Sequence, residues 1–251
     1  MKKPADTALI VNDACIAVHC DSPRLLTFHS FSMQLLHIAD MFYEKSAGFE
    51  KQHLGEELTG AMILEYQAEV TAAIFSAWFF FEATINEFFW AAQNSPSIIE
   101  GFDASEIKAL SEHIKDIRKP SSLCKYSKAL EYLKKKEYSE KDPVYDSAKL
   151  LSNLRNALVH FVPEWTGTDP RNLVPGLTGK ISLSPLFGEA FPFFPHRCLS
   201  ADCARWSLRT VCAFVDDFYE RIGIKPRQPY LEIRSELKAL KDTEPDESPK
   251  P

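Results

Sequence analysis

Glycine is scarce in this sequence, and its scarcity removes a common nucleotide-binding motif. The chain of 251 residues has only nine glycines, and nowhere are they grouped into the Gly-rich loop that cradles phosphates. A serine flanked by glycines, as in the sharp turn of hydrolases, is also missing, as is a His-Glu-x-x-His zinc motif. Any chemistry in this protein therefore has to come from a less conspicuous arrangement of residues.

An excess of positive charge is missing as well. The formal net charge of -6 argues against a protein that coats nucleic acid by bulk electrostatics. Residues 242–250 contribute four acids and one base to it, and this composition predicts a disordered tail over 241–251. Between Phe102 and Lys141 the balance reverses to ten Lys or Arg against seven Asp or Glu. That segment either faces phosphates or forms a solvated helix face, which is the commoner case.

No apolar run is long enough to suggest a membrane span. Val70 to Phe81 are all apolar or small, but Glu82, Asn86 and Glu87 interrupt the run before it reaches a bilayer-spanning length. We therefore expect a central core helix from about Met62 to Asn94, and no membrane. The first residues lack an apolar core followed by a small-residue cleavage site, so the expected location is the cytoplasm.

The six cysteines are too scattered for a disulfide framework. Cys15 and Cys20 are five residues apart, as are Cys198 and Cys203, and a histidine lies close to each pair. Structural zinc sites usually hold at least one pair two to four residues apart. We expect reduced thiols with neither a metal nor a cofactor, and metal analysis would test the zinc alternative.

Capping signals divide most of the chain into helices. A serine or aspartate followed by proline, or by glutamate three residues later, marks a helix start, and glycine marks an end. These signals are Ser22 with Pro23, Asp103 with Glu106, Ser121 or Ser122, Asp142 with Pro143, Ser200 with Gly223 as the end of its helix, and Pro229 for a short last helix.

The expected fold class is all-α. It is an antiparallel helical bundle in a single domain over residues 1–240, with its core at about 22–224. Ala8–Val11 and Lys180–Leu183 are expected to form at most a small accessory strand pair. An irregular insertion rich in proline and phenylalanine occupies 163–199. Its stretch PLFGEAFPFFPHR is expected to pack over the bundle end, although stacking on nucleic acid bases is the alternative.

The helix that stops at Pro163 carries an arginine, an asparagine and a histidine among apolar residues in the stretch LSNLRNALVHFVPEW. A helical period places Leu154, Leu158 and Phe161 on the core-facing side. Asn156 and His160 lie one turn apart on another face and can hydrogen-bond. Arg155 falls at the boundary between the core-facing side and the solvent-facing side of the helix. A guanidinium there cannot lose its proton and needs an anionic partner.

An ordinary structural interpretation of these residues exists. His160 can interact with the carbonyls at the helix end, and Arg155 can pair with a buried carboxylate such as Glu82.

Arg155, Asn156 and His160 also form a pattern that resembles the HEPN superfamily (higher eukaryotes and prokaryotes nucleotide-binding). In its ribonuclease members, an Arg, four to six residues and a His mark the end of a long bundle helix, often with a polar residue directly after the Arg. The aromatic stretch FFFEATINEFF and the helix after Ser200 fit the surroundings of that motif. The resemblance covers about Leu64 to Gly223. Phe161 and Val162 follow His160 where some toxin members have a tyrosine, so regulation through that tyrosine is not expected.

The resemblance implies an endoribonuclease that needs no metal and works as a homodimer. His160 of one protomer would act as base and His160 of the other as acid, while Arg155 from both sides binds the phosphate and Asn156 holds the imidazole or touches the phosphate. Glu82 and Asn86 would position Arg155, unless they belong to a buried structural ion pair. The implied role is a toxin or phage-defence effector with an antitoxin or regulatory partner. The alternatives are a non-catalytic dimerisation or binding module, and a nucleotide-binding helper of a transferase.

Overall fold

The fold was established from a computed structural model of the chain. It describes residues 11–12, 15–18, 26–94, 101–113, 119–161, 169–225 and 230, with side chains described from Ser30 onward except that of Pro170. The chain divides into two compact units, Ser30–Ile224 and a unit formed by Met1–His29 with Lys225–Pro251. Each unit is considered by itself.

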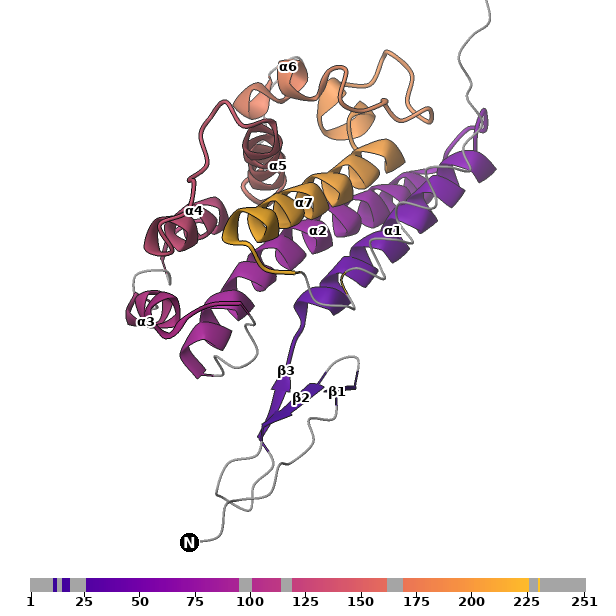
Figure 1. Cartoon of the computed structure of the whole chain (residues 1–251). Helices are drawn as coiled ribbons and strands as arrows, with labels where there is room; N and C mark the ends of the chain where they lie inside the picture. The colour runs from indigo at the N-terminus through magenta and orange to yellow at the C-terminus, as the bar shows by residue number, and fades with distance from the viewer. Residues whose placement is uncertain are drawn as a thin grey trace, which may run out of the picture. The chain divides into compact units, whose positions relative to one another are not determined.

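The unit Ser30–Ile224 is an all-α bundle, as predicted. It contains α1 (Ser32–Gln52), α2 (Gly60–Asn94), α3 (Ala104–Glu112), α4 (Ser122–Tyr132), α5 (Pro143–Val159), α6 (Leu173–Leu177) and α7 (Ala201–Ile222). The short helices η2 (Pro170–Asn172) and η3 (Phe193–Arg197) belong to the insertion between α5 and α7. Figure 1 shows α1, α2 and α7 lying side by side, with α5 running across α7.

The other unit contributes a small antiparallel sheet in the order β1-β2-β3. Its strands are β1 (Val11–Asn12), β2 (Cys15–Val18) and β3 (Leu26–His29), with Val11 opposite Ile16 and Cys15 opposite His29. The expected partner Lys180–Leu183 forms no strand, and Ile181 makes only an isolated bridge to Thr178. Ala8 to Ile10, the remainder of the other expected strand, lie outside the described residues.

The prediction that the first helix begins at Ser22 with Pro23 is wrong. Leu26–His29 pair with β2 as a strand, and α1 begins only at Ser32. Glu87 of α2 explains that start, because its carboxylate accepts the backbone N–H groups of Phe31 and Ser32 at 2.9 and 3.0 Å. The first N–H groups of a helix need such acceptors, and here a distant residue supplies one.

The capping signals at Asp103, Ser121 and Ser200 are confirmed. Asp103 and Glu106 form a complete capping box, and Ser121 and Ser200 accept the N–H groups of Cys124 and Cys203. α5 follows Asp142 with proline in its first turn, although the Asp142 carboxylate accepts the N–H of Ser139 instead of capping the helix. α7 ends at Gly223, whose φ of 76° is the left-handed conformation that suits glycine. Of the expected last helix after Pro229, only Tyr230 belongs to the described residues. The acidic tail lies outside them entirely.

The core is built around α2 and is rich in aromatic rings. Phe81 of α2 stacks on Tyr126 of α4 with ring centroids 4.6 Å apart, and its ring meets that of Phe214 of α7 edge-on at 5.0 Å. The Tyr126 hydroxyl donates to the carbonyl of Phe81 at 2.9 Å, so this buried polar group is satisfied. These contacts join α2, α4 and α7.

By length and composition, α2 is the one described helix that could cross a membrane, and half of the relevant window is buried inside the protein. The core helix of a soluble protein passes the same test, and the burial of Phe80, Phe81 and Phe89 agrees with that role.

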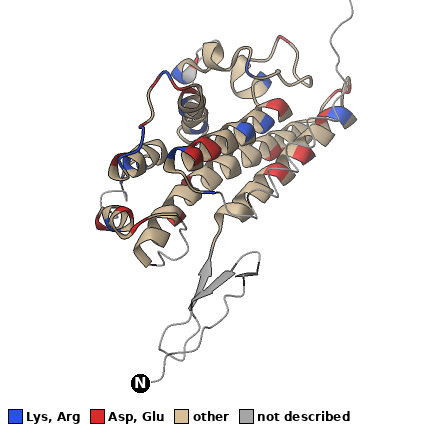
Figure 2. Ribbon diagram, viewed as in Figure 1, with Lys and Arg blue, Asp and Glu red and all other residues tan. Residues whose placement is uncertain are grey.

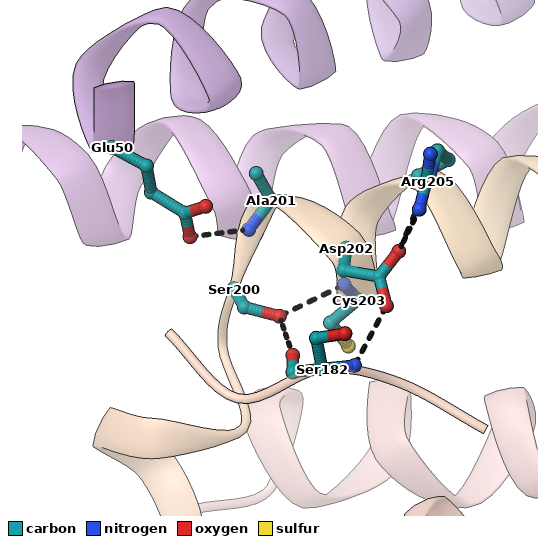
Figure 3. Close-up of polar contacts among 7 residues, drawn as sticks. All are labelled: Glu50, Ser182, Ser200, Ala201, Asp202, Cys203 and Arg205. Carbon is teal, nitrogen blue, oxygen red and sulfur yellow. Dashed lines mark hydrogen bonds and ion pairs between the residues drawn. The ribbon is translucent and has the colours of Figure 1, made fainter. Parts of the chain in front are cut away.

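The start of α7 is fixed by polar contacts from two other segments, drawn in Figure 3. Glu50 near the end of α1 accepts the N–H of Ala201 at 2.9 Å. Ser200 donates to the carbonyl of Ser182 at 2.7 Å, and Asp202 accepts the N–H of Ser182 at 2.7 Å. Because side chains of α7 satisfy this backbone, residues 180–183 are held without a neighbouring strand.

Candidate functional site

The three candidate residues Arg155, Asn156 and His160 lie near the end of α5 and at the first residue beyond it. Leu150, Leu151, Leu154 and Ala157 are buried and hold the helix on the bundle. Arg155 and Asn156 are half-buried, and His160 is exposed. His160 ends the helix, and its backbone N–H donates to the carbonyl of Asn156 at 3.0 Å.

Arg155 has no carboxylate partner among the residues that the structure describes. Its Nη1 donates to Oδ1 of Asn156 at 2.8 Å, and its Nε is buried without any hydrogen-bond acceptor. The expected anionic partner is thus replaced by a neutral amide. A guanidinium has five N–H donors and a permanent charge, and among the described residues only Asn156 accepts a hydrogen bond from it.

Asn156 contacts Arg155 and not the imidazole. Its side-chain oxygen accepts from the guanidinium, while its backbone oxygen accepts from the N–H of His160. This amide therefore orients the arginine, and it connects Arg155 to His160 only through its own backbone.

Glu82 and Asn86 do not hold Arg155, in contrast to the predicted second shell. Lys125 of α4 lies between them, with Nζ 2.9 Å from Oδ1 of Asn86 and 3.5 Å from Oε1 of Glu82. Lys125 is only 5% exposed, so its charge needs these acceptors. The structural alternative for Glu82 and Asn86 applies, with a lysine from α4 as the cation. Lys125 lies 43 residues from Glu82 in the sequence, so no local pattern around Glu82 could predict this contact.

Phe161 is the other residue that the sequence misplaced. The helical period put it on the core-facing side, yet its side chain is 54% exposed. The reason is that α5 ends at Val159, so the periodicity no longer applies two residues later. Pro163 was the available signal, because a helix usually ends before the residue that precedes a proline.

The described part of the chain offers no metal site. It contains no group of three or more His, Cys, Asp or Glu residues placed to hold an ion. Cys124, Cys198, Cys203 and Cys212 are free thiols, and the side chains of Cys15 and Cys20 lie outside the described residues.

Charge is dispersed over the bundle. Lys and Arg are interspersed with Asp and Glu on α1, α3, α4, α5 and α7, whereas α2 carries four glutamates and neither Lys nor Arg (Figure 2). Of the segment 102–141, Lys125 is buried, and Lys108 and Lys135 pair with glutamates. The arrangement favours the solvated, internally paired interpretation of that segment.

Comparisons of the chain with protein-family models, with curated proteins and with solved structures find no match.

Proposed function

We propose that this protein is a metal-independent endoribonuclease of the HEPN type, acting as a homodimer. The observation that carries the proposal is the half-buried Arg155, which has no carboxylate partner among the described residues and lies five positions before the exposed His160. A phosphodiester would supply the anion that Arg155 lacks. Guanidinium groups bind phosphate oxygens through two parallel hydrogen bonds.

The reaction needs only groups of this kind. A base takes the proton of the 2′-hydroxyl, the 2′-oxygen attacks the adjacent phosphorus, and an acid protonates the departing 5′-oxygen. One chain offers one exposed histidine in this constellation, so two protomers would supply the base and the acid as two copies of His160. Arg155 from each side would stabilise the charge that develops on the phosphorane. The products are a 2′,3′-cyclic phosphate and a 5′-hydroxyl.

Asn156 has a defined part in this scheme. Its hydrogen bond to Nη1 fixes the guanidinium plane and leaves other N–H groups for the phosphate. We therefore treat Asn156 as a positioning residue for Arg155, and we assign no role in the reaction to Glu82 or Asn86.

The biological setting belongs to the same proposal. We place the protein in the cytoplasm as a toxin or phage-defence effector, restrained by an antitoxin or another regulatory partner. Uncontrolled RNA cleavage would damage the host, which is the reason to expect such a partner.

The test is cleavage of end-labelled RNA by the purified protein in excess chelator. Wild type should yield fragments with cyclic phosphate ends, and His160→Ala should reduce the rate by about 100-fold or more, the range for loss of general acid–base catalysis. Arg155→Ala should reduce it by about 100-fold to 1,000-fold, as for loss of a transition-state donor.

Matched controls are available on other helices. His37 of α1 and Arg209 of α7 are exposed residues of the same types, and His37→Ala and Arg209→Ala should leave the rate unchanged. If Arg155→Ala and His160→Ala cleave like wild type, the activity belongs to other residues and the proposal is wrong. A dimer that binds RNA but never cuts it would favour the non-catalytic module.

A further inference from the structure

Phe161 is an exposed aromatic side chain directly beside His160. More than half of its surface faces solvent, although burial of a phenylalanine is favourable. Among the described residues, the ring of Phe194 contacts it, 6.2 Å away from centroid to centroid at an interplanar angle of 36°. The pair joins the end of α5 to the insertion.

Phe194 is itself held by a fixed stretch of backbone. The N–H of Cys198 donates to the carbonyl of Phe193 at 2.8 Å, and the carbonyl of Arg197 accepts from the N–H of Ser184 at 2.8 Å. Phe194 lies within η3 with extended backbone angles (φ -109°, ψ 137°), between residues whose carbonyls accept these two hydrogen bonds. A ring held in this way presents its free face at little entropic cost.

The same segment brings another exposed ring and another cation with an unused donor. Phe191 is 39% exposed and packs on Phe187 and His196. The Nε of Arg197 is buried without an acceptor, as is the Nε of Arg155. Exposed aromatic rings together with arginines are the residue types with which proteins bind unpaired nucleotides.

We infer that Phe161, supported by Phe194, is a stacking site for an unpaired base next to the phosphate that Arg155 and His160 engage. This inference rests on the proposed function and narrows its substrate to single-stranded RNA. Consecutive Cα atoms are about 3.8 Å apart, so a base on Phe161 belongs to a nucleotide adjoining His160. With a net charge of -6, the chain cannot rely on bulk attraction, and stacking would supply affinity instead.

The test measures binding separately from cleavage. Fluorescence anisotropy with His160→Ala as the parent protein follows short labelled oligonucleotides: single-stranded RNA, single-stranded DNA of the same sequence, and duplex RNA. Stacking does not require the 2′-hydroxyl, so both single strands should bind and the duplex should not. Adding Phe161→Ala should weaken single-strand binding about 10-fold to 100-fold.

Three further variants identify the cause. Phe161→Trp should retain binding, and Phe161→Leu should lose it, because leucine keeps an apolar side chain without a π face. Phe31, 53% exposed at the start of α1, is the matched control, and Phe31→Ala should bind like the parent.

The inference is overturned if Phe161→Ala binds as tightly as the parent, if Phe161→Leu retains binding, or if no single strand binds. It is also overturned if Phe161→Ala converts a dimer to monomers with unchanged binding per chain, which would make Phe161 a protein contact. Cleavage by wild type together with any of these results leaves the proposed function standing. If single strands bind in a way that depends on Phe161 but wild type cuts no RNA, the stacking site is supported and the ribonuclease proposal is wrong.

Discussion

Glu50 is a partly buried carboxyl group that joins three segments of the bundle. It accepts from the Tyr66 hydroxyl of α2 and from the N–H of Ala201 at the start of α7. The same Tyr66 hydroxyl lies 2.9 Å from Oγ of Ser184 in the insertion. Burial raises the pKa of Glu50, and although the hydrogen bonds from Tyr66 and Ala201 act in the opposite direction, burial is the larger effect.

This shift predicts a pH-dependent contribution to stability. The folded state holds the Glu50 proton more tightly than the unfolded chain, whose ordinary pKa is 4.5. The contribution is therefore fully present below pH 4.5 and is lost as the pH rises through the folded pKa. Urea unfolding should show the stability of wild type relative to Glu50→Gln decreasing as the pH rises from 4.5 toward neutrality. Glu44→Gln, an exposed change on the same helix, should show no such trend.

The buried thiols give a prediction about reactivity. Burial raises the pKa of Cys198 to about 12 and that of Cys203 well above its ordinary value. Only the thiolate reacts with alkylating reagents, so both should resist iodoacetamide at pH 8 in the folded protein and react in urea. Cys124, which is half-buried, should be modified before Cys198 and Cys203. Site-by-site mass spectrometry measures this, and protection that disappears on adding chelator would instead indicate zinc.

At the scale of elements, a buried lysine adds a polar contact between α4 and α2. Lys125 has a side chain 6% exposed, whereas that of Glu82 is 39% exposed. Loss of Glu82 leaves a buried ammonium group with one amide acceptor, while loss of Lys125 leaves a carboxylate that water can reach. The two substitutions should therefore differ in cost.

Glu82→Ala should lower the free energy of unfolding by about 1–3 kcal/mol, the cost of leaving a buried polar group with too few hydrogen-bond acceptors. Lys125→Met should be close to neutral, because replacing a buried charge by an apolar side chain of similar shape often is. Urea titrations of both single variants and the double variant measure the coupling. Lys125→Met should also leave RNA cleavage unchanged. If cleavage is lost while stability stays normal, Glu82 and Asn86 do have a role in the reaction.

Local signals predicted the elements well, and distant contacts explain the failures. The caps at Asp103, Ser121 and Ser200 were readable because donor and acceptor lie within three residues of each other. The start of α1 could not be predicted from the local sequence. It depends on the pairing of β3 with β2 and on the carboxylate of Glu87, which is 55 residues from Ser32.

The candidate site shows the same division. The helical period correctly placed Leu154 on the buried side of α5, whereas the side chain of Asn156 contacts Arg155 and not His160. Lys125 as the partner of Glu82 required the packing of α4 on α2, which no pattern within α2 contains.

At the scale of the whole molecule, the proposed chemistry needs two chains. Closed twofold pairing is the commonest arrangement for a homo-oligomer and places the same residues of both copies across one axis. A composite site with one His160 as base and the other as acid loses its function when either copy is missing. The solution mass should then be twice the 28.5 kDa of one chain.

Subunit mixing distinguishes a shared site from two independent ones. After exchange of wild type with an equal amount of His160→Ala, random pairing leaves about a quarter of the dimers with both histidines. Cleavage per wild-type chain should therefore fall to about half, since the mixed dimers contribute nothing. Independent sites would leave cleavage per wild-type chain unchanged. Mixing with His37→Ala should preserve it in either case, and differently tagged chains confirm that exchange took place. An undiminished rate after verified exchange with His160→Ala would mean that each protomer cuts alone, and then a single exposed imidazole would have to serve as both base and acid.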